Sequence, residues 1–522
     1  MRTHTEPAPP ALERIAPEDA TVPSVVGSAA EAYGTKPFIV DGSGRTLTFA
    51  ENCRRARQFA NALLDNGIGR GSVVGVFSPN SFDFVTAAYG TLASGAVFTP
   101  FNSSYKEREL VHQILNSGAS VVFAERSLMP RLLACRGRIQ NCRLIELQPG
   151  FWESAPDSDP GVDFDRERDI VFLPYSSGTT GFSKGIELTQ ANLLAAIRQL
   201  LFSRHSLLES EGRCYVFLPL YHIYGFNVVM NLLLAAGSTI HLRARFDMDD
   251  CLDTIERERI TSLPLVPPVL LGMLSREDLP KRDFSSMQWV SIGAAPVPVP
   301  AVHRFVDITG VTVRQGYGMT ETSGIATTNP ADAPWDVAET AGLPVRGLDV
   351  AVFDPDSGDR RLPAGGTGEL ALRGPNIMLG YHNAPEENAR ALRNGWFYTG
   401  DIGHIDSLGR VHIVDRKREM IKYRGFQVLP AELESVILEL PEVQDVAVIG
   451  VRDTHGAESP KAYVTLHPNR ALEAKAVQEY VRSQVAGYKQ VREVEFVDSI
   501  PRSPAGKILR RLLHAGERPS RY

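Results

Sequence analysis

The sequence predicts an α/β protein: a large N-terminal domain of α/β sheets plus a β-rich subdomain, followed by a small, mobile α+β C-terminal domain. One observation is a recurring order of apolar β-rich run, Gly/Ser/Pro loop and helical pattern. A second is a change of character near Asp415, where a charged turn is followed by short helices and strands. The third is length, because 522 residues with 43% apolar side chains are enough for two or more domains.

The recurring order predicts parallel strands joined by crossover helices. Such sheets bind ligands in the loops at the carboxyl ends of their strands, so these loops are the candidate sites. The four clearest pairs of strand and helix are Ser72–Ser78 with Asn80–Leu92, Ile170–Pro174 with Leu188–Leu201, Cys214–Pro219 with Phe226–Ala235, and Trp289–Ile292 with Pro300–Ile308.

The β-rich subdomain is predicted from Gly368–Gly374 and Gly409–Val414, which are typical of antiparallel strands. After Asp415 the pattern predicts helices over Pro430–Leu440 and Leu472–Val485. The strands expected with them are Val443–Val451, Lys461–Leu466 and Glu493–Val497. The expected domains are a flexible leader over 1–20, an N-terminal domain over 21–414, a hinge over 415–417 and a C-terminal domain over 418–522.

Composition excludes several classes of protein. A net charge of −6 and a pI of about 6.1 argue against a nucleic-acid-binding protein, which would carry a basic surface. The five cysteines form no CxxC pair, so reduced thiols are expected, in the cytoplasm. The leader lacks the apolar core of a signal peptide. The longest apolar run, Tyr224–Gly237, is interrupted by Asn227 and Asn231 and is too short to cross a bilayer, so we expect a buried helix.

A loop rich in hydroxyls and glycines follows Tyr175 and ends at Lys184. Glycines let backbone N–H groups approach an anion closely, and only about ten of the 55 basic residues are lysine, so this loop indicates a phosphate site. It is not a Walker A loop, because Ser183 rather than glycine precedes the lysine. The alternative is a solvated loop without a ligand.

The loop resembles the signature of the adenylate-forming (ANL) superfamily, which includes acyl-CoA synthetases, non-ribosomal adenylation domains and firefly-type luciferases. The resemblance covers about Phe38 to Leu512, rests on several motifs in the family's order, and is nearest to the coumarate- and fatty-acid-CoA ligase branch. It implies the ANL fold and an enzyme that joins a carboxylic acid to AMP, using ATP and Mg²⁺, and then transfers the acyl group to coenzyme A (CoA).

The nucleotide site follows from the resemblance of several motifs. Tyr317 is expected to stack on adenine, Thr320 to bind the adenylate phosphate and Glu321 to ligate Mg²⁺, which prefers oxygen ligands. Asp401 is expected to accept hydrogen bonds from both ribose hydroxyls. Taken alone, each of these segments also fits a turn. The expected ATP- and AMP-binding residues are Ser176, Ser177, Gly178, Thr179, Thr180, Lys184, Gly293, Ala294, Ala295, Pro296, Gln315, Gly316, Tyr317, Gly318, Thr320, Asp401, Arg416 and Lys507.

The segment Leu218–Gly225 resembles one wall of the family's acyl pocket, where His222 helps position the substrate carboxylate; taken alone it also fits a buried core histidine. No aspartate follows to pair with an α-ammonium group, so we expect an acid without one. Plant coumarate ligases typically have proline where Gly324 stands, which argues against a specific claim for hydroxycinnamates. A mostly apolar pocket suits an aryl or medium-chain acyl group. The expected acyl-pocket residues are Tyr221, His222, Tyr224, Phe226, Gly316, Met319, Ser323, Gly324 and Ile325.

The charged turn that follows the β-rich subdomain resembles the hinge of the family. Its residues here are Asp415, Arg416 and Arg418. The resemblance implies that the C-terminal domain rotates about this hinge between the two half-reactions. In one pose Lys507 bridges the acid and the α-phosphate; the alternative for its segment is a disordered basic tail. In the other pose the loop after the hinge lines the thiol channel. The expected thiolation residues are Lys422, Arg424, Gly425 and Gln427. The family usually has lysine where Arg418 and Arg424 stand, and this chain uses arginine as its default cation.

The resemblance therefore predicts an ATP-dependent acid–thiol ligase. The expected catalytic residues are Lys507, His222, Thr320, Glu321 and Lys184, with Glu321 as the metal ligand. The expected acceptor is CoA, and the alternative is the phosphopantetheine of a carrier protein in a secondary-metabolite pathway. A luciferase and a nucleotide-binding regulator without catalysis are further alternatives; a regulator would lack the equivalents of Lys507 or Glu321, and both are present. We expect a monomer or homodimer.

Overall fold

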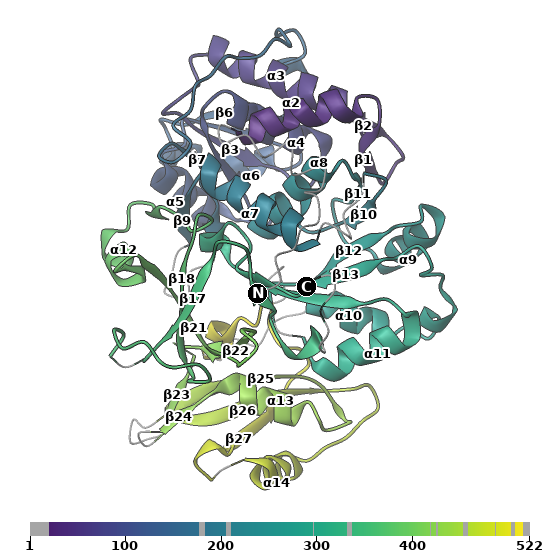
Figure 1. The fold of residues 1–522 in the computed structure, drawn as a ribbon, viewed down its shortest axis with the longest axis vertical. Coiled ribbons are helices and arrows are strands. Elements are labelled where there is room, and N and C mark those ends of the chain that lie inside the picture. Colours follow the sequence, from purple (N-terminus) through teal and green to yellow (C-terminus); the bar gives the residue numbers. More distant parts are fainter. Residues whose placement is uncertain are drawn as a thin grey trace.

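The computed structural model describes residues 20–176, 183–204, 210–295, 297–330, 333, 337–355, 357–417, 419–423, 426–452, 458–485, 487–502 and 507–514. Figure 1 shows a large body with a β-rich part at its side and a C-terminal α+β part at the end opposite helices α2 (Val22–Tyr33) and α3 (Phe49–Asp65). The α/β class predicted from the sequence is confirmed. In the described ranges, no helix combines the length and the apolar character that a membrane crossing requires.

The first large sheet has nine strands in the described residues and a parallel centre. Its strands in spatial order are β16 (Leu343–Pro344), β15 (Thr327–Thr328), β14 (Val313–Tyr317), β13 (Trp289–Ile292), β12 (Ser262–Leu265), β10 (Arg213–Val216), β11 (Thr239–Leu242), β1 (Pro37–Asp41) and β2 (Thr46–Thr48). The helices connected with it are α8 (Leu232–Ala236), α9 (Met248–Arg257), α10 (Pro267–Leu274) and α11 (Val299–Thr309). Helix α8 continues the π-helix η4 (Tyr224–Asn231), so the apolar run forms the buried helix that the sequence predicts.

In the second large sheet, one helix begins later than the sequence predicts. Residues Lys184–Thr189 form a strand antiparallel to the strand Ile170–Phe172. The helix predicted from Leu188 therefore begins at Gln190, where Thr189 and Asn192 cap it with reciprocal hydrogen bonds. The strands in spatial order are β19 (Gly380–Tyr381), β9 (Lys184–Thr189), β7 (Ile170–Phe172), β4 (Val97–Phe101), β3 (Val73–Phe77), β5 (Val121–Ala124) and β6 (Arg143–Glu146), with β8 (Tyr175–Ser176) beside β9. Its helices are α4 (Phe82–Ala93), α5 (Glu107–Ser117), α6 (Met129–Leu133) and α7 (Gln190–Arg204).

The two large sheets share one hydrophobic core. At its centre Phe226 of η4 stacks on Phe172 of β7, with ring centroids 4.6 Å apart, and Phe172 stacks on Phe98 of β4 at 5.6 Å. All three side chains are fully buried. Because aromatic side chains bury large apolar areas, this stack fixes the helical segment after His222 against the second sheet.

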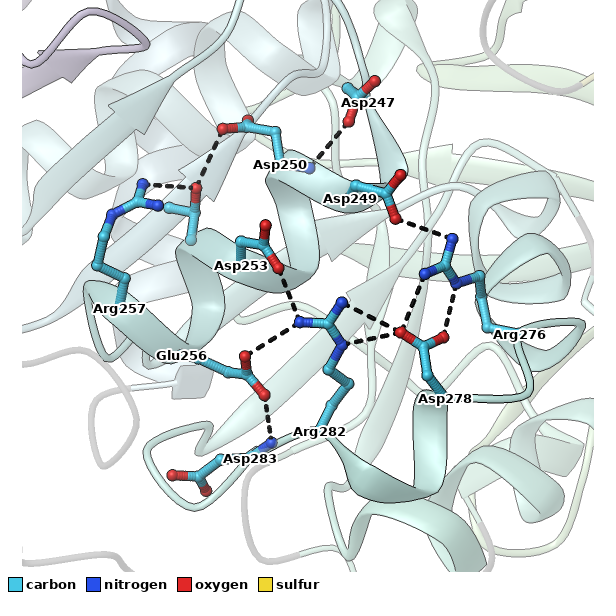
Figure 2. A network of polar contacts seen from close by, with 11 residues as sticks. Asp247, Asp249, Asp250, Asp253, Glu256, Arg257, Arg276, Asp278, Arg282 and Asp283 are labelled. Carbon is cyan, nitrogen blue, oxygen red and sulfur yellow. Dashed lines mark hydrogen bonds and ion pairs between the residues drawn. The ribbon is translucent and has the colours of Figure 1, made fainter.

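A charged network fixes α9 to the segment that follows α10 (Figure 2). Arg282 donates to Asp253 at 2.7 Å and to Glu256 at 3.1 Å, and it lies 3.1 Å from Asp278. Asp278 also binds Arg276, at 2.7 Å. The network lies on the surface, where solvent and salt weaken such pairs, so its role is to orient α9 rather than to form a ligand site.

The β-rich part consists of antiparallel strands, which confirms the prediction for Gly368–Gly374 and Gly409–Val414. Its strands are β17 (Asp349–Phe353), β18 (Gly368–Arg373), β20 (Leu392–Arg393), β21 (Trp396–Ile405) and β22 (Val411–Arg416), and α12 (Pro385–Ala391) lies beside them. The predicted hinge residue Asp415 lies inside β22, so this strand continues to the edge of the C-terminal part.

The C-terminal part has its own core, with Leu433, Val446, Val464 and Val477 fully or almost fully buried. Its elements are β23 (Ile421–Tyr423), β24 (Phe426–Val428), α13 (Pro430–Ile437), β25 (Val443–Arg452), β26 (Glu458–Leu466), α14 (Ala474–Gln484), β27 (Glu493–Phe496) and α15 (Arg510–His514). The short 3₁₀ helices among the described residues are η1 (Arg136–Arg138), η2 (Pro149–Phe151), η5 (Leu279–Lys281), η6 (Thr320–Thr322), η7 (Val337–Glu339) and η8 (Gly487–Lys489). A separate core makes movement of this part as one body possible.

Candidate active site

Three residues predicted to bind the nucleotide meet where β14, β21 and β22 come together. Asp401 lies opposite Arg416 in the β21–β22 ladder, and its carboxylate binds Arg416 Nε at 2.7 Å. The same carboxylate accepts a hydrogen bond of 2.6 Å from the Tyr317 hydroxyl, whose pKa is raised well above its ordinary value by burial and then by the charge of Asp401. The Asp401 side chain is 3% exposed. Each carboxylate oxygen can accept more than one hydrogen bond, so the group can still bind a diol.

The turn after β14 depends on close backbone approach at two glycines. A Cβ at Gly318 would lie 2.4 Å from the carbonyl oxygen of Gly324, and Gly324 itself has a φ of +103°. Residues with side chains rarely adopt this conformation, and proline is restricted to a φ of about −65°. A chain with proline at position 324 therefore could not adopt the backbone conformation found here.

Two buried amide side chains bind the backbone of this turn. Asn376 Nδ2 donates to the carbonyl oxygens of Thr322 and Ile325, at 3.1 and 2.6 Å, and Asn227 Nδ2 donates to that of Ser323 at 2.9 Å. Both amides are fully buried. Sequence analysis missed Asn376 and noted Asn227 only as an interruption of an apolar run; that interruption was the available signal, because a buried amide needs hydrogen-bond partners.

The predicted metal ligand and the predicted phosphate lysine both lie next to Tyr381. The Tyr381 hydroxyl donates to Glu321 Oε1 at 3.0 Å, and Lys184 Nζ lies 5.5 Å from the centre of the Tyr381 ring. Lys184 Nζ also donates to Glu387 Oε1 at 2.9 Å. The structure thus brings Lys184 and Glu321 together, and it adds Tyr381 and Glu387, which no motif in the sequence had singled out.

His222 is held in one neutral form. Its Nδ1 accepts a hydrogen bond of 3.2 Å from the Tyr224 backbone N–H, which leaves the ring proton on Nε2. Burial, and then the positive charge of Lys507, lowers the His222 pKa to about 4. Lys507 of the C-terminal part therefore lies close enough to act on His222. The π-helix η4 begins two residues later, and such segments are frequent at functional sites.

We expect His222 to stay neutral from about pH 5 to pH 8, because its pKa is about 4 against an ordinary 6.5. Its ring signals in NMR spectra of ¹⁵N-histidine-labelled protein should not titrate in this range. In Lys507→Ala the pKa should rise, but not to 6.5, because burial is the larger cause. The unfolded chain binds this proton more tightly, so the histidine's contribution to stability is complete above about pH 6.5 and is lost as the pH falls towards 4. An unchanged pKa in the variant would contradict the proximity of the two groups.

The residues predicted to form the acyl pocket do not all line one space. Tyr224 lies over Gly293, where an added Cβ would meet its ring at 3.4 Å. Phe226 and Ser323, in contrast, are fully buried: the π-helix turns Phe226 into the core, and Ser323 Oγ donates to the Asn376 carbonyl oxygen at 3.0 Å. Both therefore support the pocket wall from behind instead of lining it, and Ile325 is almost fully buried as well. The partly exposed members are Tyr221, His222, Tyr224, Gly316, Met319 and Gly324.

The remaining predicted site residues either lie apart from the contacts given above or fall outside the described ranges. Gln315 Nε2 donates to the Ala338 carbonyl oxygen at 2.5 Å, and Ala294 has a φ of +73°. The predicted residues that lie outside the described ranges are Ser177, Gly178, Thr179, Thr180, Pro296, Arg418, Arg424 and Gly425. The side chains of Lys422 and Gln427 also lie outside the part of the chain that the structure describes.

Helix α13 connects the predicted hinge with the segment that carries Lys507. The buried Asp415 carboxylate accepts a hydrogen bond of 2.9 Å from the backbone N–H of Ala431, in the first turn of α13. Glu434 of the same helix binds Arg510 at 2.6 Å, three residues after Lys507. These contacts join the segment that follows Lys507 to the predicted hinge through α13.

Comparison with known proteins identifies the family. The model of the AMP-binding enzyme family matches residues 27–382, and the model of the AMP-binding enzyme C-terminal domain matches residues 432–507. The chain belongs to the AMP-binding enzyme family. It is 36% identical over 495 residues to Peroxisomal OPC-8:0-CoA ligase 1 of Arabidopsis thaliana, with 92% of this chain and 90% of that protein covered.

Two further comparisons agree with this assignment. This AMP-binding enzyme is 36% identical over 506 residues to 4-coumarate–CoA ligase 1 of Oryza sativa subsp. japonica, with 92% of this chain and 89% of that protein covered. The crystal structure of ATP-bound MatB from Rhodopseudomonas palustris matches with a TM-score of 0.89 at 28% identity, over 96% of this chain and 99% of that one. The chain therefore has the ANL fold and is an AMP-forming acid–thiol ligase of the acyl-CoA synthetase family.

Proposed function

We propose that this AMP-binding enzyme joins a hydrophobic carboxylic acid to AMP, releases pyrophosphate, and then transfers the acyl group to CoA. The observation that carries the proposal is the buried Asp401 carboxylate, which binds both Arg416 and the Tyr317 hydroxyl. The positive charge of Lys507, which contributes to the lowered pKa of His222, supports it. Lys507 belongs to the proposed C-terminal domain, 418–522, and His222 to the proposed N-terminal domain, 21–414. A cation from one domain beside a neutral hydrogen-bond donor from the other suits a reaction between two anions.

In the first half-reaction the substrate carboxylate attacks the α-phosphorus of ATP, and the bond from that phosphorus to the pyrophosphate oxygen breaks. Lys507 is proposed to lie between the carboxylate and the α-phosphate, where its charge offsets their repulsion. Neutral His222 would donate from Nε2 to the carboxylate and orient it, and Lys184 would bind the departing pyrophosphate. Orientation of this kind can contribute about 7–11 kcal/mol.

The nucleotide is proposed to bind where Tyr317, Asp401 and Arg416 meet. The Tyr317 ring would stack on adenine, while its hydroxyl stays bound to Asp401. The ribose hydroxyls would donate to the free lone pairs of Asp401, whose charge Arg416 balances. Thr320, at the start of the turn after β14, would donate to the phosphate of the adenylate.

Mg²⁺ fits the oxygen donors near Glu321. The Glu321 carboxylate lies beside the Tyr381 hydroxyl, and the Thr320 hydroxyl belongs to the same turn. Within the part of the chain that the structure describes, no group of three or more His, Cys, Asp or Glu side chains could hold a metal ion alone, which suits an ion held by one carboxylate and by phosphate oxygens. When bound, Mg²⁺ would neutralise negative charge on the polyphosphate.

In the second half-reaction a thiol attacks the acyl carbonyl, the bond to the phosphate oxygen breaks, and AMP leaves. We propose that the C-terminal domain rotates about 415–417, which withdraws Lys507. The residues proposed to reach the thiol channel are Lys422, Arg424, Gly425 and Gln427. The hydrogen bond between Asp415 and the Ala431 backbone joins the two sides of this hinge, so the rotation should change it.

A cavity of about 730 Å³ beside Tyr221 is the proposed site for the nucleotide end of CoA. Among the described residues, Lys106, Arg131 and Arg245 line it, against one carboxylate, Glu125. Arg131 donates to two backbone carbonyls of the neighbouring loop, at 2.9 Å each, and so fixes one wall. An excess of positive charge in a concave site suits a diphosphate.

Arg245→Ala is expected to raise the KM for CoA about fivefold, because the loss of one partly solvated contact to a phosphate is worth about 1 kcal/mol. ATP–pyrophosphate exchange, which needs no CoA, should stay unchanged. Arg54→Ala, at an exposed arginine of α3, is the control and should change neither measurement. If Arg245→Ala had the same KM for CoA as the unmodified enzyme, this cavity would not be the CoA site.

The proposed substrate is an acid with an aryl or medium-chain group and no α-amino group. The segment after His222 offers no carboxylate to pair with an ammonium, and the Asn227 amide is already bound to the carbonyl oxygens of Leu193 and Ser323. Partly exposed Tyr224 and Met319 give the wall an apolar character.

The test is ATP–pyrophosphate exchange with a panel of aryl, fatty and amino acids, followed by mass spectrometry of the product formed with CoA. We expect exchange with acids that lack an α-amino group, and acyl-CoA as product. Exchange without consumption of CoA, but with loading of a carrier protein, would favour the alternative acceptor. Absence of exchange with every acid would contradict the proposed reaction.

The proposed compartment is the cytoplasm, and the proposed assembly is a monomer or homodimer. All five cysteines are free thiols, and four of them are buried. Such cysteines suit a reducing compartment. Cell fractionation and light scattering on the purified enzyme test the two statements.

A further inference from the structure

The ion pair between Lys184 and Glu387 lies inside the group of side chains proposed to bind the polyphosphate of ATP. Lys184 Nζ and Glu387 Oε1 are 2.9 Å apart, with side chains 27% and 35% exposed. The same ammonium lies 5.5 Å from the ring centre of Tyr381, whose hydroxyl binds Glu321. The lysine that would receive the polyphosphate therefore already has an anionic partner.

Backbone pairing holds Glu387 beside Lys184. Strand β9 begins at Lys184 and pairs antiparallel with β19, which places Tyr381 opposite Ile186. Asn388 of α12 accepts a hydrogen bond of 2.6 Å from the Tyr381 N–H and donates one of 2.9 Å to its carbonyl oxygen. These two bonds attach α12 to β19. Glu387 directly precedes Asn388, so the carboxylate is held beside Lys184, where β9 begins.

The charge of Glu387 opposes the binding of a polyphosphate. The hydrogen bond and the charge of Lys184 hold the Glu387 pKa below its ordinary value, so the carboxylate is ionised at neutral pH. It then acts in two ways: it occupies the nearest ammonium, and it repels the incoming anion. Both effects reach only the part of a nucleotide that lies near Lys184.

We propose that Glu387 is the resting partner of Lys184, which the β- and γ-phosphates of ATP displace, so that Glu387 sets the affinity of this enzyme for ATP. The proposal rests on the role proposed above for Lys184. When ATP binds, the ammonium moves from the carboxylate to the phosphate oxygens, and the partly exposed carboxylate turns to solvent. AMP has no β- or γ-phosphate and leaves the ion pair intact.

Glu387→Gln keeps the shape of the side chain and removes its charge. We expect the dissociation constant of α,β-methylene-ATP with Mg²⁺, measured by calorimetry on the full chain, to fall about two- to fivefold, the size expected for one partly exposed ion pair. The dissociation constant of AMP should not change. At 0.5 M NaCl the difference should shrink, because salt screens charges at this exposure.

Glu386→Gln is the matched control, because it removes the same charge one residue earlier. Its side chain is 83% exposed and lies 3.6 Å from Arg390, on the surface. This variant should bind α,β-methylene-ATP and AMP as the unmodified enzyme does.

Two results would overturn the assignment. One is binding of α,β-methylene-ATP by Glu387→Gln that is unchanged or weaker; the other is an equal change for AMP, which would indicate a general effect on the fold. Lys184→Ala separates these outcomes from the proposed function. If Lys184→Ala binds the analogue as tightly as the unmodified enzyme, the role of Lys184 itself fails. If it binds more weakly while Glu387→Gln binds no tighter, only the role of Glu387 fails.

Discussion

Replacement of Lys507 by alanine is expected to slow adenylation by about 10²- to 10³-fold, the size typical for loss of one group that stabilises developing charge. The reason is electrostatic: the carboxylate and the α-phosphate are both anions, and Lys507 is the cation proposed to lie between them. ATP–pyrophosphate exchange measures this step. Formation of acyl-CoA from supplied acyl-AMP should keep its rate, because the proposed rotation withdraws Lys507 before the thiol attacks.

The control for this variant is Lys475→Ala, in the same part of the chain. Lys475 lies on α14 with a side chain that is 81% exposed, so its loss should affect neither half-reaction. Lys507→Arg adds a second check, since it keeps the charge but not the compact shape of the ammonium. We expect it to retain part of the exchange activity. If Lys507→Ala lost both half-reactions equally, the two-pose mechanism would be wrong.

Sequence analysis named Tyr317, Asp401 and Arg416 from the resemblance of their motifs, and local backbone geometry explains why these three residues meet. Tyr317 ends a parallel strand of the first large sheet, where ligand-binding loops are expected. Asp401 and Arg416 are neighbours because a hairpin joins their strands, and its register places them opposite each other. Short-range pairing of this kind can be inferred from two strand patterns and the turn between them.

The parts that could not be predicted depend on pairing between distant segments. Strand β19 joins β9 from almost 200 residues away, and this pairing, with the attachment of α12 to β19, places Tyr381 and Glu387 beside Lys184. Nothing near Glu387 in the sequence indicates a phosphate site. Asn376 is a similar case, because its amide matters only once the segment after β18 lies next to the turn after β14.

The position of Phe226 could not be predicted from the sequence for a different reason. The sequence predicts a buried helix over this stretch, and the structure has one, but the first eight residues form a π-helix. A π-helix has a wider turn than an α-helix, so the faces on which successive side chains lie are shifted. Phe226 therefore packs on Phe172 in the core, whereas the resemblance of its segment to the family's acyl-pocket wall had placed it in the pocket.

Asp401→Asn is expected to weaken the binding of AMP about 100-fold. The almost fully buried carboxylate forms an ion pair with Arg416 Nε at 2.7 Å and accepts a hydrogen bond of 2.6 Å from the Tyr317 hydroxyl. An amide has one acceptor oxygen, so one of these donors, or one ribose hydroxyl, must lose its partner. Hydrogen bonds to a charged group contribute about 1.5–3 kcal/mol each, and about 1.4 kcal/mol corresponds to a factor of ten. Calorimetry with AMP measures the effect.

The comparison with 2′-deoxy-AMP shows whether the loss arises at the ribose. The unmodified enzyme should bind AMP more tightly than 2′-deoxy-AMP, and Asp401→Asn should lose most of this preference, because the acceptor of the 2′-hydroxyl has changed. Asp406→Asn is the control: Asp406 follows β21 and binds Arg410 and His412, away from Tyr317. If Asp401→Asn weakened both nucleotides equally and kept the preference, Asp401 would act by holding Arg416 and Tyr317 in place, and the ribose would have another partner.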